Sequence, residues 1–524
     1  MKKILLFSFL LPLFIAKAQT CVPATGQIDL DINNVRARLL AGGDMWWDQG
    51  LGSARYEVPK GSGHHTMFAS SLWLGGIDAG GKIHVAAQTY RQTGNDFWPG
   101  PIDTSLQINA TQCGIYDRHW RVTKAEIQSH IINPLNSTQA ITSWPAKGNN
   151  VGGGIINRDL APFVDVNNNG IYDPINGDYP KINGDQAIWW VINDIGNAHT
   201  ESQARALGVE VQVMAYAFAT NNILNNTTFY NYNITNRSDT TYNDFYIGYW
   251  TDSDLGDGFD DYIGYDSTRN AAIYYNSDNS DTQYGTNIPI AAIAGISTPV
   301  ENGVAVKMKY GGYFLNNSTP QGNPFTAENF YNYLTGKWKD GNNWASKYAY
   351  PGSPCNSAEV SMVHPTLQTP ADLRTIQSFG PMTLQPNQCK NITTAVITTF
   401  NSAYPNPCFD NIRASIDSVK NLHNSLATSA LSCQNLTSIY ELKNNENDFL
   451  IYPNPASDVI SITTKYKSVA SFSIIKIDGS IVTSGRINSG VSTIDIEHFS
   501  KGIYFVQLRD NSGAIFATKK FVKN

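Results

Sequence analysis

The stretch Phe449-Leu-Ile-Tyr452-Pro-Asn-Pro455-Ala-Ser-Asp458 begins the part of the chain whose fold the sequence indicates most clearly. Apolar and polar residues then alternate at 460–463, and further candidate strands follow at 472–477, 480–483, 491–496, 503–508 and 514–522. A period of two is typical of strands with one buried face. Asp478-Gly479 supplies the positive φ angles of a two-residue hairpin turn. Residues 448–524 are therefore predicted to form a small, immunoglobulin-like antiparallel β-sandwich.

Three motifs of this segment narrow its assignment. Tyr452-Pro-Asn-Pro455 begins it, Asp478-Gly479 lies near its middle, and Gly502-Ile-Tyr504 lies near its end. In this order they resemble the type A sorting domain of the type IX secretion system of Bacteroidetes. The resemblance implies that the type IX machinery is a partner and that residues 19–433 are a folded cargo. It also implies removal of the sorting domain, followed by release or by attachment to surface lipopolysaccharide.

The first 18 residues have the three parts of a signal peptide. Lys2-Lys3 precedes an apolar run from Ile4 to Ala16, and Ala16-Lys-Ala18 is a small-residue cleavage site. The run is shorter than the roughly 20 residues of a transmembrane helix, and no other stretch is long and apolar enough to span a membrane. We therefore expect a protein that passes through the periplasm and is secreted or displayed on the outer cell surface.

Composition and charge exclude one class of partner. The chain has 524 residues, enough for two to four domains, and a formal net charge of −6. It contains no block of lysine and arginine, which a surface that neutralises phosphates requires. We therefore expect no nucleic-acid partner.

The six cysteines are expected to pair, because the predicted route passes through an oxidising compartment. Six cysteines allow 15 arrangements, and the sequence leaves these open apart from one pair. Residues 410–429 carry apolar side chains at helical spacing, and such a helix is about 30 Å long. The four residues that follow could return only about 14 Å, whereas disulfide Cα atoms lie within about 7 Å. A bond between Cys408 and Cys433 is therefore not expected.

The cargo region 19–433 is predicted to be an antiparallel β-sandwich with loop insertions and one C-terminal helix. Strand patterns occur at 67–74, 82–87, 209–220, 228–234 and 245–250. Residues 378–384 and 392–398 follow a strand–turn–strand order that resembles the closing hairpin of β-sandwich domains in large Bacteroidetes surface proteins. A break into two subdomains near residues 200–240 is left open. The polar segment 434–447 is predicted to be a linker.

Two tryptophan-containing segments have two interpretations. Met45-Trp-Trp-Asp48 and Phe97-Trp-Pro-Gly100 lie in turn-rich surroundings. Exposed tryptophans could stack on sugars, but tryptophans buried in a β core are commoner, and we favour burial.

The first candidate metal site is the segment Asp165-Val-Asn167-Asn-Asn169-Gly170-Ile171-Tyr-Asp173. Oxygen side chains at its positions 1, 3, 5 and 9, with glycine at position 6, suit a Ca²⁺ loop, and the Ile171 carbonyl would serve at position 7. The spacing resembles the aspartate loops of thrombospondin type 3 repeats and the first half of dockerin and EF-hand loops. Asn176 replaces the bidentate glutamate of an EF-hand, so flanking helices are not expected. The alternative is a turn rich in Asn and Asp without metal.

The second candidate metal site is Asp252-Ser-Asp254-Leu-Gly-Asp257-Gly258-Phe-Asp260-Asp261. Clustered carboxylates repel one another unless a cation or a cationic partner neutralises them. The segment resembles an Asp-Leu-Gly-Asp stretch of the same Bacteroidetes surface proteins, a family without an activity that transfers to this chain. The alternative is a solvated acidic loop.

Catalytic signals are weak. The histidines lack the spacing of zinc sites, and the chain has neither a Gly-x-Ser-x-Gly elbow nor a P-loop. Glu210 and Glu57 are lone candidate carboxylates, and carboxylate pairs are too plentiful to identify a glycosidase. We therefore expect a Ca²⁺-stabilised surface protein that binds a glycan or protein ligand, with adhesion or a structural role. The alternative is a secreted carbohydrate-active or other hydrolase with the same sorting domain.

Overall fold

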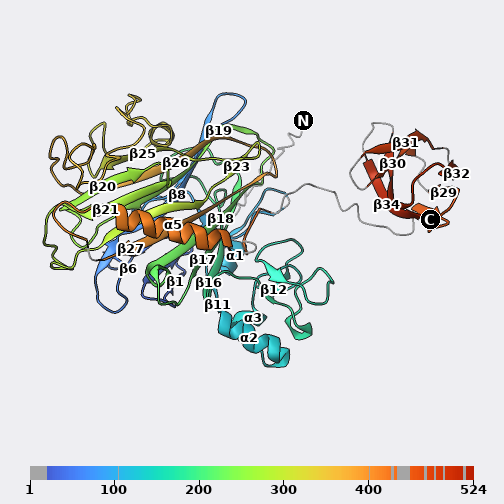
Figure 1. The fold of residues 1–524 in the computed structure, drawn as a ribbon, viewed down its shortest axis with the longest axis horizontal. Helices are drawn as coiled ribbons and strands as arrows, with labels where there is room; N and C mark the ends of the chain where they lie inside the picture. Colours follow the sequence, from blue (N-terminus) through green and yellow to red (C-terminus); the bar gives the residue numbers. More distant parts are fainter. Residues whose placement is uncertain are drawn as a thin grey trace, which may run out of the picture. The chain divides into compact units, whose positions relative to one another are not determined.

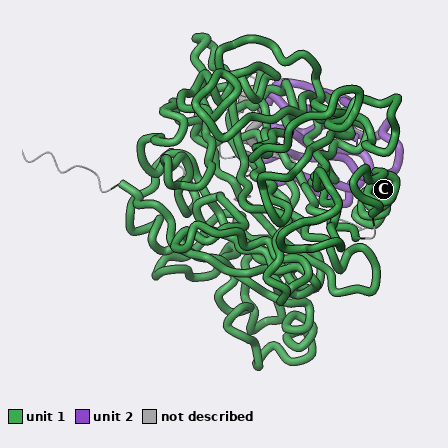
Figure 2. The backbone as a smooth tube through the Cα atoms, turned by 90° about the vertical axis from the view of Figure 1, so that its left-hand side faces the viewer, with its two compact units in different colours: residues 1–434 green, residues 435–524 purple. Residues whose placement is uncertain are grey.

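The chain folds into two compact units in a computed structural model, residues 1–434 and 435–524 (Figure 2). The structure describes residues 20–103, 105–400, 402–425, 430–433, 449–464, 469–476, 480–487, 490–510 and 515–524. The predicted signal peptide, the predicted linker 434–447, residues 426–429 and the Asp478-Gly479 turn lie outside these residues. None of the helices that the structure describes has the length and hydropathy needed to cross a membrane.

Two large antiparallel sheets form the first unit (Figure 1). In the described part of the chain, sheet 1 has ten strands. Eight follow the order β25 (Met308–Leu315), β26 (Leu373–Leu384), β19 (Tyr242–Asp252), β8 (Ala69–Ile77), β3 (Asp44–Met45), β2 (Arg36–Leu40), β6 (Tyr56–Glu57) and β7 (His65–Met67). The other two are β1 (Gln27–Leu30), which pairs with β2, and β9 (Ile83–Ala87), which pairs with β8.

Sheet 2 has nine strands among the described residues. Eight follow the order β10 (Trp98–Pro99), β16 (Gln186–Asn193), β17 (Val209–Ala217), β18 (Thr227–Asn236), β27 (Cys389–Thr399), β22 (Ile290–Ser297), β21 (Ala271–Asn276) and β20 (Asp261–Asp266). The ninth, β11 (Trp120–Thr123), pairs with β16.

The two sheets pack face to face, as the predicted sandwich requires. Trp46 donates a hydrogen bond from Nε1 to the hydroxyl of Tyr230 at 2.9 Å, which joins the turn after β3 to β18. The hydroxyls of Tyr274 on β21 and Thr375 on β26 lie 2.8 Å apart. Buried aromatic side chains therefore carry hydrogen-bonding groups across the sandwich core, where each needs a partner.

Helices cover the outer face of each sheet. α4 (Ala327–Leu334) packs on sheet 1, where the rings of Phe330 and Trp73 lie 4.7 Å apart. α5 (Asp410–Ser425) packs on β22 and β27 of sheet 2 through Ile412, Ile416 and Val419 (Figure 1). Because both faces are covered, all residues of β16, β17 and β18 are buried.

The predicted closing hairpin is wrong. β26 pairs with β19 and β25 in sheet 1, whereas β27 pairs with β18 and β22 in sheet 2. Both strands are buried over nearly their whole length, so each requires a neighbour on both sides and cover on both faces. The turn at 385–388 therefore crosses from one sheet to the other.

Three disulfides join Cys21 to Cys113, Cys355 to Cys408, and Cys389 to Cys433. The expectation that Cys408 and Cys433 do not bond is confirmed. Trp46, Trp47 and Trp98 are at most 2% exposed, so the core interpretation of both tryptophan segments is also confirmed.

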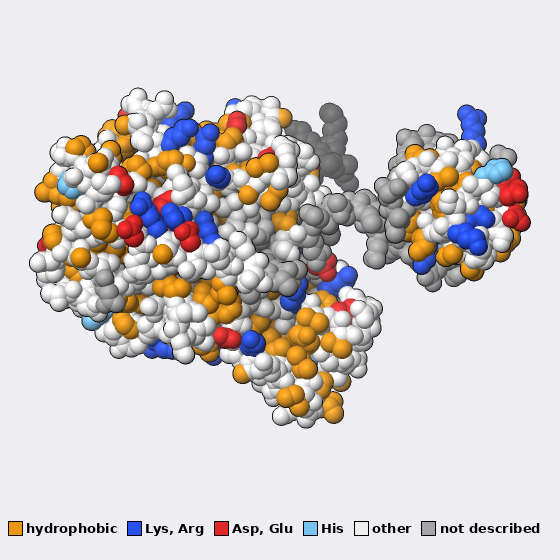
Figure 3. All heavy atoms as spheres, in the orientation of Figure 1, with side chains coloured by type: hydrophobic (Ala, Val, Ile, Leu, Met, Phe, Trp, Pro, Cys, Tyr) orange, Lys and Arg blue, Asp and Glu red, His pale blue; other side chains and the backbone are white. Residues whose placement is uncertain are grey.

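A lobe is inserted between β10 and β16 (Figure 1). It contains α1 (Ala110–Tyr116), β11, α2 (Lys124–Ile132), η1 (Pro134–Asn136), α3 (Gln139–Thr142), β12 (Asn150–Val151), β13 (Gly154–Ile155), β14 (Phe163–Val164), η2 (Pro174–Asn176) and β15 (Tyr179–Pro180). Figure 3 shows apolar side chains over much of its visible surface, where Ile132, Leu135 and Ile175 are strongly exposed.

The second unit contains two smaller antiparallel sheets. One has the order β28 (Phe449–Tyr452), β29 (Val459–Thr464) and β32 (Gly490–Asp495), and the other β31 (Ile481–Arg486), β30 (Val469–Lys476), β33 (Gly502–Asp510) and β34 (Ile515–Lys523). Ile460, Ile474, Val506 and Phe521 are fully buried in its core. The predicted strands and the small β-domain are therefore confirmed.

Candidate functional site: an aromatic cleft with an acidic cluster

A cleft of about 570 Å³ opens where β19 ends and β26 begins. Its aromatic walls are Trp47, Phe68, Tyr90, Trp250, Phe259, Phe314 and Phe325. Its polar residues include Thr89, Thr93, Glu201, Asp252, Asp254, Asn316, Asn323, Asp372 and Arg374. Apolar walls with a few converging polar groups are typical of ligand-binding sites.

Packing against neighbouring rings holds the aromatic walls in place. The ring of Tyr90 meets those of Trp250, Trp47 and Phe68 edge to face, with centroids 5.2, 5.8 and 5.8 Å apart. Trp47 also donates from Nε1 to Asp44 at 2.8 Å. The rings therefore form a surface that changes little when a ligand arrives.

Three aspartates converge in the cleft. Asp252, Asp254 and Asp372 each offer a carboxylate oxygen, and these oxygens all lie within 4.8 Å of one another. Among the residues that the structure describes, this is the one such group of three or more His, Cys, Asp or Glu side chains. Oxygen ligands at this spacing suit Ca²⁺.

Asp252 is the buried member of this group. Its Oδ2 accepts hydrogen bonds from the Tyr90 hydroxyl and, at 3.3 Å, from Nη2 of Arg374, its cross-strand partner. Its Oδ1 is buried and has no hydrogen-bond partner among the described residues. Arg374 also forms an ion pair with Asp372, so one guanidinium faces three carboxylates.

The electrostatics of the cluster favour a further positive charge. Burial and then the Asp254 carboxylate raise the pKa of Asp252 well above its usual range. Burial and then Asp372 raise the pKa of Asp254 to about 6. A cation bound here would lower both pKa values, because it favours the charged form of each carboxyl.

Glu201 is a fourth acid in the cleft. The hydroxyls of Thr89 and Thr93 donate to its two carboxylate oxygens. Burial nevertheless raises the pKa of Glu201 to about 7. A carboxyl with this pKa can hold or release a proton near neutral pH.

The second predicted acidic segment is divided by the fold. Asp252 and Asp254 belong to the cleft, whereas Asp257, Asp260 and Asp261 do not line it. The Asp257 amide donates to Asp281 at 2.9 Å, and Asp261 pairs across β20 and β21 with Asn276. A single ion bound by all five predicted aspartates is therefore not supported.

The first predicted loop lies at the surface of the inserted lobe. Asp165 accepts hydrogen bonds from the amides of Asn169 and Gly170 at 3.2 and 2.7 Å. Asp173 accepts from the side-chain amides of Asn167 and Asn169 at 3.1 and 2.9 Å. These predicted ligands lie in one turn and satisfy one another through hydrogen bonds, and calcium at this loop stays a prediction.

Two further positions of this loop are informative. Gly170 has a φ angle of 79°, the left-handed conformation that the predicted tight turn requires of it. Ile171, whose carbonyl was predicted as a ligand, donates its amide to Asn169 Oδ1 at 2.9 Å. Asp178 accepts from the amides of Val166 and Asp173 at 2.8 and 3.0 Å.

Glu210, a lone candidate for catalysis, lies in surroundings that indicate a structural role. It is fully buried on β17 and forms ion pairs with Arg158 and Arg237, the latter at 2.9 Å. Burial opposes its ionisation, but the two guanidinium groups lower its pKa below the usual value.

Sequence reasoning missed Asp372, Arg374, Tyr90 and Glu201. None of them lies in a motif, and Asp372 is far along the chain from Asp252. The antiparallel register of β19 and β26 places Arg374 opposite Asp252 and so brings Asp372 into the cleft. The local pattern of either segment alone contains no signal of this meeting.

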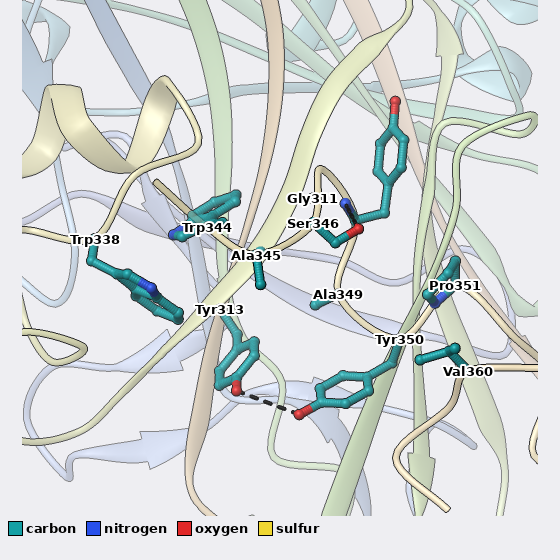
Figure 4. Close-up of a pocket in the computed structure, with 12 residues that line it drawn as sticks. Gly311, Tyr313, Trp338, Trp344, Ala345, Ser346, Ala349, Tyr350, Pro351 and Val360 are labelled. Carbon is teal, nitrogen blue, oxygen red and sulfur yellow. Dashed lines mark hydrogen bonds between the residues drawn. The ribbon is translucent and has the colours of Figure 1, made fainter. Parts of the chain in front are cut away.

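A second pocket, of about 370 Å³, has a different chemistry (Figure 4). Tyr313 on β25 and Trp338, Trp344 and Tyr350 from the segment after α4 line it. Figure 4 shows the hydroxyls of Tyr313 and Tyr350 directed toward one another, and their oxygens lie 3.5 Å apart. Its lining includes no charged side chain.

Comparison with protein families identifies the second unit. Residues 450–524 match the model described as "Secretion system C-terminal sorting domain". The protein therefore carries a sorting domain of the type IX secretion system, as predicted. It is exported by that system to the cell surface or the surrounding medium.

Comparisons of the whole chain add little. No curated protein matches its sequence significantly. A polysaccharide lyase aligns at 9% identity and a TM-score of 0.20, over 60% of this chain and 34% of the lyase, so the alignment spans about a third of that enzyme. A biofilm-associated protein domain aligns at 10% identity and a TM-score of 0.14, over 98% of this chain and 84% of the domain. Both TM-scores are too low to carry an argument about the cargo.

Proposed function

We propose that this exported protein binds a glycan in the cleft, with a Ca²⁺ held by Asp252, Asp254 and Asp372. The observation that carries the proposal is the convergence of these three carboxylates in a cleft with aromatic walls. The ion would neutralise the cluster and offer open coordination positions to ligand hydroxyls. The exposed rings of Phe259 and Phe325 would provide the apolar surface against which a sugar ring stacks.

The polar residues of the cleft fit this role. Asn316 and Asn323 each provide amide donors and acceptors, and their side chains hydrogen-bond to each other at 2.9 Å. Neutral groups of this kind suit hydroxyl-rich ligands, which both donate and accept. One carboxylate oxygen, Asp252 Oδ1, is buried and has no hydrogen-bond donor among the described residues. This supports a bound cation rather than a purely solvated acidic surface.

A glycoside hydrolase is the second candidate, and one observation favours it. Glu201 and Asp254, both in the cleft, have pKa values raised to about 7 and about 6. Glycosidases use a protonated carboxylic acid as general acid and a second carboxylate as base or nucleophile. Cleavage of a bound glycan would place the protein in this class.

The test is glycan binding by the mature full-length protein, measured by array and calorimetry in calcium or in a chelator. Asp372→Asn removes one proposed ion ligand, and Asp29→Asn is the matched control. Both aspartates form ion pairs with arginine, and their side chains are 21% and 27% exposed. We expect calcium-dependent binding that falls at least about tenfold, or 1.4 kcal/mol, in Asp372→Asn but not in Asp29→Asn.

Three outcomes decide between the candidates. Binding that is indifferent to both calcium and Asp372→Asn would contradict the ion site. Absence of binding across acidic and neutral glycans would contradict the glycan proposal. Release of new reducing ends from a bound glycan, lost in Glu201→Gln, would establish the hydrolase instead.

We also infer that the sorting domain is removed after export and that the cargo is then released or joined to surface lipopolysaccharide. The domain match in residues 450–524 supports this inference. Deletion of residues 448–524 should leave the cargo in the periplasm, as cell fractionation would detect. In wild-type cells, a cell-surface form larger than the cargo and reactive with lipopolysaccharide antibodies would favour attachment over release.

A further inference from the structure

A second group of oxygens lies at the start of the β20–β21 hairpin. Asp261 and Asn276 are cross-strand partners, and their side chains are 2% and 0% exposed. Residues directly opposite each other in an antiparallel pair place their side chains on the same face. Tyr265 on the same face donates its hydroxyl hydrogen to the Gly312 carbonyl of sheet 1 at 2.5 Å, so this face is the inner one.

Both members of the pair present an oxygen without a donor. Asp261 Oδ2 accepts from the Leu255 amide at 2.7 Å, but its Oδ1 has no hydrogen-bond partner among the described residues. Asn276 Nδ2 donates to Asp278 Oδ1 at 3.2 Å and to the Ser280 carbonyl at 3.4 Å. These bonds fix which end of the amide is nitrogen, and they leave Asn276 Oδ1 buried and unpartnered.

Unpartnered buried acceptors are unfavourable, and two on adjacent positions are more so. A cation satisfies both at once, because carboxylate and amide oxygens are ligands that Ca²⁺ prefers. Water could donate to each oxygen, but it would leave the negative charge of the site uncompensated.

The surroundings of the pair add negative charge. Asp260 also has a buried Oδ1 without a partner, and Asp257 and Asp281 lie close by. In the part of the chain that the structure describes, no lysine or arginine forms an ion pair with any of these carboxylates.

The backbone holds the two contributing loops together. Asp281 accepts from the amide of Asp257 at 2.9 Å and from the amides of Gln283 and Tyr284 at 2.8 and 2.6 Å. Gly256 has a φ angle of 77°, and any side chain there would collide with the Asp281 carboxylate. The close approach of these loops therefore depends on glycine at position 256.

We propose that Asp261 Oδ1 and Asn276 Oδ1 are ligands of a structural Ca²⁺, with Asp260 and Asp281 supplying negative charge around it. This site shares no ligand with the cleft, so it does not rest on the proposed function. Asp261 also accepts from the Leu255 amide through Oδ2, so the ion fixes the carboxylate that anchors the segment 253–260, which carries Asp254 into the cleft. It therefore stabilises the loop on which glycan binding would depend.

The test uses calcium alone as the probe, on mature full-length Asp372→Asn protein, in which the cleft site is disabled. Thermal melting is compared in a chelator and at about 5 mM calcium, roughly ten times a typical Kd of extracellular calcium modules. We expect calcium to raise the melting temperature by about 1–3 °C. Adding Asp261→Asn should abolish this rise.

Asn276→Asp gives an independent signature. The substitution keeps an oxygen toward the ion, adds a charge and loses the amide donors to Asp278 and Ser280. In chelator it should melt lower than its parent, and calcium should close most of that gap because the added carboxylate strengthens the site.

Asp266→Asn is the matched control. Asp266 lies on the same strand, is 6% exposed and is paired with Arg269 and Arg413. It should destabilise the protein equally in chelator and in calcium. The proposal would be overturned if calcium still raised the melting temperature in the Asp261→Asn variant. It would also be overturned if calcium left the melting-temperature deficit of Asn276→Asp unchanged. Either result would assign a shared proton to the pair instead.

Discussion

The two predicted metal loops of this protein differ in composition and in physical state: residues 165–173 have two aspartates and three asparagines, and residues 252–261 have five aspartates. In the loop 165–173, the carboxylates are at the surface, and backbone and asparagine amides donate to them. In the segment 252–261, Asp252 and Asp261 are 2% exposed, and each has one oxygen with no donor among the described residues. Burial and the supply of hydrogen-bond donors therefore separate the two segments.

The supply of hydrogen-bond donors accounts for this difference between the two segments. Asparagine at positions 167 and 169 gives the first loop side-chain donors of its own. The second segment contains no asparagine, and apart from the Ser253 hydroxyl its other non-acidic residues are glycine, leucine and phenylalanine, which offer only backbone amides. Burial raises the free energy of each oxygen that has no hydrogen-bond donor, and a bound cation offsets this better than other partners.

The largest expected difference between the loops concerns Asp252. Asp252→Ala should lower the free energy of unfolding by about 3 kcal/mol, because it leaves the Arg374 guanidinium buried with less compensation. Asp165→Ala should lower it by about 1 kcal/mol, since only hydrogen bonds at the surface are lost. Denaturant unfolding of both variants measures this difference, and equal losses would remove the distinction between the loops.

Glu201 allows the effect of burial to be distinguished from the effect of missing hydrogen-bond donors. It is buried, but both its carboxylate oxygens accept from threonine hydroxyls. Its pKa is raised from 4.5 to about 7, so the folded protein holds a proton that the unfolded chain has released. The free energy of unfolding should therefore fall as pH rises from 4.5 to about 7. This contribution is about 3–3.5 kcal/mol and should vanish in Glu201→Gln.

The measurement is the pH dependence of unfolding for the wild type and Glu201→Gln in chelator. The two curves should converge at low pH and separate above neutrality, with the variant more stable there. Parallel curves across this range would show that the hydroxyl donors hold the pKa near its usual value.

The effect of calcium on the free energy of unfolding should distinguish the two loops by a smaller amount than the alanine substitutions do. Addition of about 5 mM calcium should stabilise the wild-type cargo by about 1–2 kcal/mol. Asp254→Asn should remove much of this effect, because it takes away one of three converging carboxylates. Calorimetric titration of both proteins with calcium measures the change, and an unchanged titration would mean that the cleft binds no calcium.

The smallest effect is expected for the first loop. A variant with both Asp165→Asn and Asp173→Asn should lose less than about 0.5 kcal/mol of the calcium-dependent stabilisation, because amides already satisfy this loop. Thermal melting in chelator and in calcium tests this. A loss as large as that of Asp254→Asn would reverse the ranking and make the first loop the stronger calcium site.

The strands and the sorting domain were predictable because their signals are local. The alternation at 460–463, the apolar-rich run at 503–508 and the motif Tyr452-Pro-Asn-Pro455 each lie within one short segment. The exclusion of a bond between Cys408 and Cys433 also followed from a local quantity, the length of one helix. The strand pattern failed at 378–398, because it reveals strands but not the sheet that each one joins.

The sequence alone determined the β class, the sorting domain and the position of the acidic segments along the chain. Only the tertiary structure decided that Asp372 joins Asp252 and Asp254, that Asn276 faces Asp261, and that Asp257 and Asp260 stay apart from the cleft. The reason is that these meetings depend on strand register and on which face each side chain takes. Register is set by the burial of whole sheets, which no single segment encodes.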